Sequence, residues 1–148
     1  MGLSGHDCLM EPGSLAVVEQ WLEAVNDRDG VALEALSSER VRITGPRGAG
    51  EMDRSVLSEW LLRAGFSATP LRWFCGGDGS VVVEHDGQWR DVSTGEGQDR
   101  IRNASRFVVQ NGAVTDYERH DDGLAAALAR SGLTVADEVT TRGQLVAR

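Results

Sequence analysis

Apolar side chains recur at helical spacing in the first part of the chain. Between residues 14 and 25 they return every three or four positions, which predicts an amphipathic helix of about three turns with Ser14 as its N-cap. The polar residues and glycine at 26–30 end this helix. A short second helix is predicted over 31–36, and a third lies between a capping aspartate and a terminating glycine at 53–65.

The second part of the chain has strand-like segments that follow one another. Their β-branched and aromatic residues alternate with polar ones, and glycine-rich turns separate them. Asp86-Gly87, inside the longest segment, indicates either a bulge or another hairpin. The predicted strands are 40–44, 71–75, 80–91, 101–109 and 113–119, with a loop at 45–50 and a last helix at 124–130 that Gly132 ends.

Asn111-Gly112 is the strongest turn signal in the sequence. Both residue types tolerate the positive φ angles of a type I′ turn, so the flanking strands form a hairpin. If these two residues fill the turn, Gln110 pairs with Ala113 and Arg106 pairs directly with Tyr117. The two side chains would then lie on one face of the sheet.

Successive strands joined by short turns predict an antiparallel sheet with helices packed on one of its faces. The fold class is therefore α+β. The expected organisation is a flexible arm at 1–13, a single domain at 14–133 and a C-terminal tail at 134–148.

Charge and composition exclude several kinds of function. With 148 residues the chain is long enough for one domain with a sizeable core, and its formal net charge of −8 argues against a nucleic acid partner. All 15 basic residues are arginines, so neither a Schiff-base lysine nor the lysine of a phosphate loop is present.

The cysteines and histidines give no metal or disulfide pattern. Cys8 and Cys75 are distant in sequence and the three histidines are dispersed, so we expect reduced cysteines, no metal and no cofactor. The first residues lack the features of a signal peptide, and no apolar stretch approaches the roughly 20 residues that span a bilayer. We therefore expect a cytoplasmic protein without a membrane partner.

The order of these elements resembles the nuclear transport factor 2-like superfamily, which includes SnoaL-like polyketide cyclases, ketosteroid isomerases and limonene epoxide hydrolases. The resemblance covers Ser14 to Leu133 and rests on the opening helix with Glu19-Gln20-Trp21-Leu22-Glu23-Ala24-Val25-Asn26, the final hairpin and the helix after it. It implies a cone-shaped curved antiparallel sheet wrapped around the N-terminal helices. It also implies an apolar cavity and dimerisation through the outer face of the sheet.

The catalytic residues of known members do not carry over. Trp21 stands where an isomerase has its tyrosine, Gly45-Pro46 lacks the aspartate before the proline, and Asn103 or Ala104 replaces the second oxyanion acid. In the limonene epoxide hydrolase pattern only Asp122 matches, as the third carboxylate. The resemblance to SnoaL-like cyclases implies that Asp121 could act as acid or base.

Arg106 and Tyr117 are the first candidates for a ligand site. A guanidinium beside a phenol in a dry cavity could hold a carboxylate or enolate oxygen, while the alternative is a cross-strand pair that only stabilises the sheet. Trp21 and Trp73 could provide flat apolar walls. His85 shares a strand face with Val81 and Val83, so it is either a ligand contact or a hydrogen-bonded core histidine.

Tyr117, His120 and Asp121 are the candidates for catalysis. A histidine beside a carboxylate can act as a general base, although Asp121 or Asp122 could instead cap the last helix with His120 in solvent. The leading hypothesis is a protein that binds a small apolar molecule, with cofactor-free acid/base chemistry such as cyclisation, isomerisation or hydration. The alternative is a noncatalytic ligand-binding or dimerisation module.

The predicted register also suggests how the chain would associate. Phe107, Val109 and Val114 would form an apolar patch on the outer face of the sheet. We therefore expect a homodimer through this face.

Overall fold

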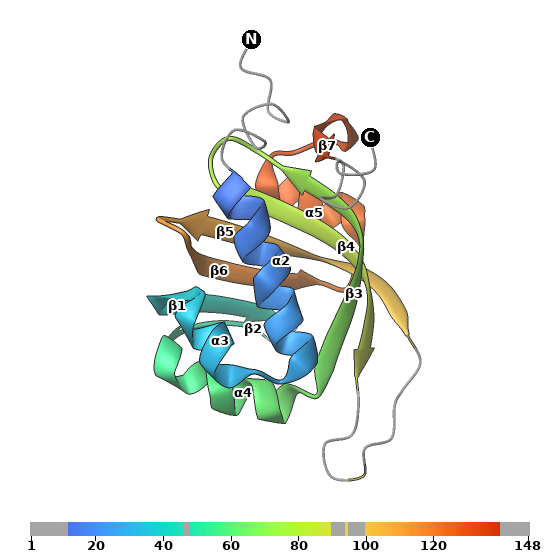
Figure 1. Ribbon diagram of the computed structural model, residues 1–148. Coiled ribbons are helices and arrows are strands. Elements are labelled where there is room, and N and C mark those ends of the chain that lie inside the picture. Colours follow the sequence, from blue (N-terminus) through green and yellow to red (C-terminus); the bar gives the residue numbers. More distant parts are fainter. Residues whose placement is uncertain (1–11, 46–47, 90–93, 95–99, 140–148) are drawn as a thin grey trace, which may run out of the picture.

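The computed structural model describes residues 12–45, 48–89, 94 and 100–139 of the chain. Two helices, two strands and a third helix come first along the chain, and four long strands and a further helix follow them (Figure 1). The helices are α2 (Pro12–Asp27), α3 (Gly30–Ala35), α4 (Leu57–Ala64) and α5 (Leu124–Ser131), with 3-10 turns η1 (Arg54–Val56) and η2 (Val135–Asp137). The strands are β1 (Ser37–Gly45), β2 (Gly48–Asp53), β3 (Phe66–Cys75), β4 (Ser80–Trp89), β5 (Ile101–Gln110), β6 (Ala113–His120) and β7 (Glu138–Val139).

The strands form one curved sheet in the order β2-β1-β6-β5-β4-β3-β7. Neighbours from β6 to β7 pair antiparallel, as expected for strands joined by turns, but β1 and β6 pair in parallel. The expectation of a purely antiparallel sheet was therefore wrong at this junction. No hairpin links β1 to β6, because α4 and four strands, β2 to β5, intervene, so turn geometry does not fix their direction.

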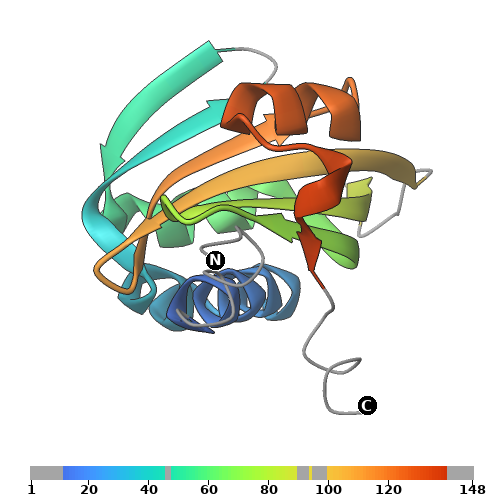
Figure 2. The same ribbon diagram turned by 90° about the horizontal axis from the view of Figure 1, so that it is seen from above.

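Helices cover both faces of the sheet, whereas the sequence predicted helices on one face. Helix α2 crosses the concave face, and α5 packs on the convex face (Figures 1 and 2). The main core lies under α2 and includes Trp21, Phe107 and Tyr117. A smaller core lies under α5, where Ala127 and Leu128 contact side chains of the convex face.

Most predicted helix ends are confirmed, with two exceptions. Gly65 and Gly132 end their helices at φ angles of 59° and 72°, and Asp53 accepts a hydrogen bond from the Ser55 N–H at the turn before α4. Helix α2 begins at Pro12 rather than after Ser14, since proline is favoured in the first helical turn. No aspartate caps α5: its N-cap is Gly123, without a side-chain hydrogen bond.

The β5–β6 hairpin has the predicted turn but not the predicted register. Asn111 and Gly112 have φ angles of 54° and 77°, as a type I′ turn requires. After Val109 pairs with Val114, however, Thr115 is an extra residue, and the next pairs are Val108 with Asp116 and Phe107 with Tyr117. Arg106 thus lies opposite Glu118, and the predicted pairing of Arg106 with Tyr117 is wrong.

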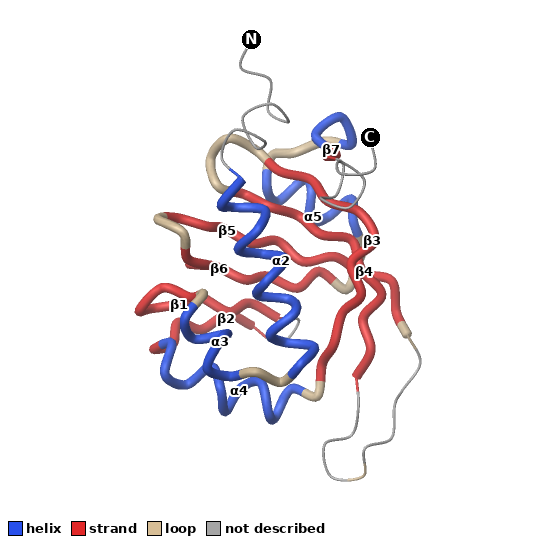
Figure 3. The backbone as a smooth tube through the Cα atoms, viewed as in Figure 1, coloured by secondary structure: helices blue, strands red, loops and turns tan. Residues whose placement is uncertain are grey.

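The strands differ from the predicted segments at other places too. The Asp86-Gly87 step is neither a bulge nor a hairpin, because both residues pair regularly with β3. Strand β4 runs beside β3 in Figure 3. Residues 48–50, predicted as loop, begin the missed strand β2. The first part of the expected tail is also ordered: Thr134 caps η2 in a capping box, and β7 pairs with β3. Residues 1–11 and 140–148 lie outside the described residues.

Cys75 is disulfide-bonded, so the expectation of reduced cysteines was wrong. The sequence has two cysteines, and the other one, Cys8, lies outside the described residues. The disulfide removes the reason for expecting a reducing compartment. Among the described residues, none of the helices has the length and apolar character needed to cross a membrane.

Candidate functional site

Three polar side chains from adjacent strands meet on the concave face of the sheet. The Nε2 atom of His85 on β4 lies 2.8 Å from the Ser105 hydroxyl on β5, which lies 3.4 Å from the Tyr117 hydroxyl on β6. His85 and Ser105 are fully buried, and Tyr117 is nearly so. Strand alternation explains the placement, because His85 follows the inward-facing Val81 and Val83, and Ser105 precedes the inward-facing Phe107.

A second set of polar side chains continues the cluster toward the surface. Asn103, which pairs directly with His85, donates from Nδ2 to Asp121 at 3.0 Å. Arg119 donates to both oxygens of Asp121, at 2.9 and 3.2 Å. Asn103 is fully buried, whereas the Asp121 side chain is 43% exposed. We call His85, Asn103, Ser105, Tyr117, Arg119 and Asp121 the concave cluster.

Burial keeps the inner groups of the concave cluster uncharged. It lowers the pKa of His85 to about 4, against the favourable effect of Asn103 on the charged form. It raises the pKa of Tyr117 to about 12, although Ser105 acts in the opposite direction. At neutral pH the site therefore presents a neutral imidazole, two hydroxyls and an amide.

Aromatic rings surround this polar line. Trp21 from α2 stacks on Tyr117 with ring centroids 5.1 Å apart, and Phe107 contacts both rings. The indole N–H of Trp21 donates to Ser37 at 3.0 Å, so it has a hydrogen-bond partner inside the core. Phe66 lies edge-on to His85 at 6.0 Å. Polar groups are thus set in an otherwise apolar interior.

Arg106 and His120 lie on the opposite, convex face. Both contact the buried carboxylate of Glu118, Arg106 at 3.5 Å and His120 at 2.9 Å, and Arg130 of α5 lies 3.2 Å from it. The sequence predicted Arg106 and Tyr117 on the same face of the sheet. Because of the bulge at Thr115, they lie on opposite faces. Arg106 therefore cannot hold a ligand beside Tyr117.

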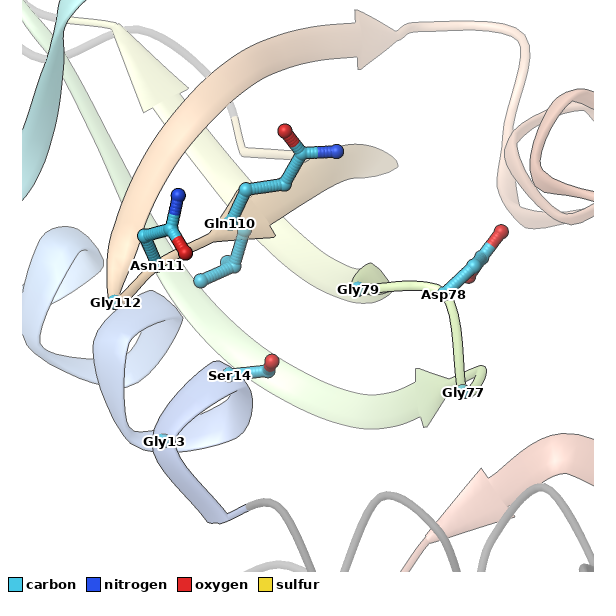
Figure 4. Close-up of a pocket in the computed structure, with 9 residues that line it drawn as sticks. Gly13, Ser14, Gly77, Asp78, Gly79, Gln110, Asn111 and Gly112 are labelled. Atoms are coloured by element: carbon cyan, nitrogen blue, oxygen red, sulfur yellow. The ribbon is translucent and has the colours of Figure 1, made fainter.

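Trp73 contributes to a separate groove rather than to the concave cluster. This groove has a volume of about 260 Å³ and lies between α2 and β3, with Leu22, Pro70 and Trp73 as apolar walls and Glu19, Glu23 and Asn26 as polar ones. A larger hollow of about 540 Å³ lies where the first turn of α2 approaches the β3–β4 and β5–β6 turns (Figure 4). Four glycines, Val109 and the polar residues Ser14, Asp78, Gln110 and Asn111 line this hollow. None of the residues proposed from the sequence as a site lines this hollow.

The structure thus brings together part of the predicted site. Trp21, His85 and Tyr117 meet in the interior and Asp121 joins them through Asn103, while Trp73, Arg106 and His120 lie elsewhere. Sequence reasoning missed Asn103, Ser105 and Arg119 as site residues. The available signal was the alternation of side chains along β5. Asn103 and Ser105 are four and two residues from Phe107, so they lie on the same face of the strand as this core residue.

Metal ligation finds no support in the described part of the chain, which contains no group of three or more His, Cys, Asp or Glu side chains placed to hold an ion. The concave cluster is built instead for hydrogen bonding. Its chemistry is that of neutral donors and acceptors in a low-dielectric interior.

Comparison with known proteins gives the fold. No family model and no curated protein matches the sequence. Solved structures do superpose on the chain, which has the nuclear transport factor 2-like fold.

Three solved structures illustrate the likeness. A nuclear transport factor 2-like protein of unknown function from Cytophaga hutchinsonii is 17% identical, with a TM-score of 0.61 over 72% of this chain and 88% of that one. A protein with a ketosteroid isomerase-like fold from Catenulispora acidiphila, in complex with trimethylamine, is 20% identical, with a TM-score of 0.60 over 80% and 93%. TerC, co-crystallised with polyporic acid, is 15% identical, with a TM-score of 0.62 over 80% and 96%.

Proposed function

We propose that this protein binds a small, largely apolar molecule on the concave side of the sheet, where the concave cluster contacts the polar group of that molecule. The observation that carries the proposal is a set of buried polar side chains within an aromatic interior. Two of their atoms, Nδ1 of His85 and Oδ1 of Asn103, have no hydrogen-bond partner among the described residues. Buried polar atoms normally have partners, and a few convergent polar groups in an apolar setting are typical of ligand sites.

Solved structures of the same fold support a small-molecule ligand. The Catenulispora acidiphila protein is in complex with trimethylamine, and TerC was co-crystallised with polyporic acid. At these levels of identity the comparison carries the fold and not the identity of the ligand.

Binding is better supported than acid/base catalysis. A general base works best when its pKa lies near the working pH, and a pKa of about 4 makes His85 a weak base at neutrality. Asp121 already accepts hydrogen bonds from Arg119 and Asn103. Tyr117 keeps its proton and can donate a hydrogen bond to a ligand oxygen, which favours recognition over proton abstraction.

Homodimerisation and a cytoplasmic location stay predictions. The patch from which a dimer was inferred, Phe107, Val109 and Val114, is buried in the main core, so that reasoning was wrong. On the convex face, α5 covers Phe74, Val82 and Ala104. Light scattering at micromolar concentration measures the oligomeric state.

A neutral apolar fluorophore, N-phenyl-1-naphthylamine, tests the proposed site. We expect saturable fluorescence enhancement with the wild-type protein, because the dye brightens in an apolar environment. Ser105→Val replaces the hydroxyl with a methyl group and adds a second methyl in the concave cluster, and it should weaken binding at least tenfold. Arg130→Ala changes an exposed residue of α5 on the other face and serves as the matched control.

The outcomes separate the site from the function. Equal affinity of Ser105→Val and wild type would place the dye outside the concave cluster. Small-molecule binding would be refuted if the wild-type protein gave no saturable fluorescence enhancement with the dye and no heat of binding with polyporic acid in calorimetry.

A further inference from the structure

The orientation of the Asn103 amide follows from its neighbour. Asp121 is held by Arg119 and is an acceptor, so the amide nitrogen of Asn103 must face it, as the 3.0 Å contact shows. The carbonyl atom Oδ1 consequently points away from Asp121 and has no partner within the described residues. Asn103 is fully buried, so its carbonyl oxygen is shielded from bulk solvent and has no hydrogen bond of ordinary geometry to the described residues.

His85 adds a second unpartnered atom beside the first. His85 and Asn103 are directly paired across β4 and β5, so their side chains leave the same face of the sheet. Nε2 of His85 is engaged by Ser105. The Asn103 side chain interacts with His85 and favours its charged form, but no hydrogen bond of ordinary geometry reaches Nδ1 in the described structure. A neutral imidazole carries one N–H, so Nδ1 is an acceptor when Nε2 donates to Ser105 and a donor when Ser105 donates to Nε2.

Two arginines could in principle offer a positive charge to a ligand here: Arg119 in the concave cluster and Arg106, which the sequence suggested. Both are already engaged by carboxylates. Arg119, whose charge acts on His85, makes two hydrogen bonds to Asp121. Arg106 lies on the convex face against Glu118. A carboxylate or enolate would meet the Asn103 carbonyl without a compensating cation, and burying an unpaired charge is costly.

We propose that the concave cluster selects a neutral hydroxyl or N–H group on an otherwise apolar molecule. This group donates a hydrogen bond to Oδ1 of Asn103 and exchanges a second one with Nδ1 of His85. A hydroxyl fits because it can donate to the carbonyl while accepting from the imidazole, and an NH₂ group fits because it can donate to both. The inference rests on the proposed function and replaces the carboxylate or enolate expected from the sequence.

Three probes with the same aromatic body separate donor, acceptor and anion. They are 4-methylphenol, 4-methylanisole and 4-methylbenzoate, titrated into protein with ¹⁵N-labelled histidine. We expect 4-methylphenol to move the Nδ1 resonance of His85 and to bind roughly threefold to tenfold more tightly than 4-methylanisole, the effect of one hydrogen bond. We expect 4-methylbenzoate to bind more weakly than either.

Paired variants assign the effect to Asn103. Asn103→Ala removes Oδ1 and should abolish the preference for 4-methylphenol over 4-methylanisole, while Arg102→Ala, at the exposed neighbouring position of β5, should preserve it. If Asn103→Ala does not fold, the shift of the His85 Nδ1 resonance in the wild-type protein on addition of 4-methylphenol tests the proposal instead. Equal affinities for phenol and anisole, or an unmoved Nδ1 resonance, would overturn the donor inference and leave the proposed function standing. Failure of all three probes, together with N-phenyl-1-naphthylamine, would overturn both.

Discussion

Replacing Phe107 with alanine tests the register of the final hairpin. In the structure Phe107 is fully buried, and its ring centroid lies 5.4 Å from that of Trp21 and 5.2 Å from that of Tyr117. Removing a buried phenylalanine ring costs about 3–5 kcal/mol of unfolding free energy. The neighbouring Val108 is only half-buried on the other face, so Val108→Ala should cost about 1 kcal/mol.

Urea unfolding followed by tryptophan fluorescence measures both changes. With a slope of about 2 kcal/mol per molar urea, Phe107→Ala should lower the midpoint by about 2 M and Val108→Ala by about 0.5 M. Under the register first predicted, Phe107 would lie on the convex face and its removal would change association instead of stability. A Phe107→Ala variant with a near-native midpoint, or one less destabilised than Val108→Ala, would refute the bulged register.

Three further predictions concern the convex face, the buried histidine and the disulfide. Glu118→Ala should destabilise the fold by about 3 kcal/mol in urea because it leaves Arg106 with an unpaired, mostly buried charge, whereas Glu51→Ala at an exposed pair should cost less than about 1 kcal/mol. The folded pKa of His85, about 4, lies below its ordinary 6.5, so the unfolded chain protonates first and stability should fall by about 3 kcal/mol between pH 6.5 and 4. A His85→Gln variant with the same pH dependence would contradict this. Cys75 should not react with a thiol reagent in denaturant until a reductant is added, and prompt reaction without reductant would disprove the disulfide.

Local signals in the sequence predicted the elements that depend on local chemistry. The Asn111-Gly112 turn and the glycine ends of α4 and α5 follow from φ angles that few other residues adopt. The burial of His85 followed from its parity with Val81 and Val83. These predictions were correct because neighbours in sequence determine them.

Features decided by packing between distant segments could not be predicted in the same way. The pattern of α5 shows an apolar side but not which face of the sheet it covers, and nothing local indicates that β1 pairs with β6. Asn103 and Ser105 look like ordinary polar strand residues until β4 and β6 lie on either side of them. The register error had one usable signal: without a bulge, the aromatic residues Phe107 and Tyr117 would lie on opposite faces.

The extra residue at Thr115 determines the composition of both faces of the sheet. With the bulge, Tyr117 reaches Ser105 on the concave side, and Arg106 and Glu118 pair on the convex side. The Thr115 hydroxyl lies 3.3 Å from the Val108 carbonyl and 2.9 Å from the Asp116 carboxylate, so the extra residue has local partners. Without the bulge, and with Ser105 still on the concave face, the carboxylates of Asp116 and Glu118 would face the core in place of Tyr117, and the His85–Ser105 line would end without the phenol. The neutral character of the concave cluster, and with it the class of ligand proposed here, therefore depends on this irregularity in β6.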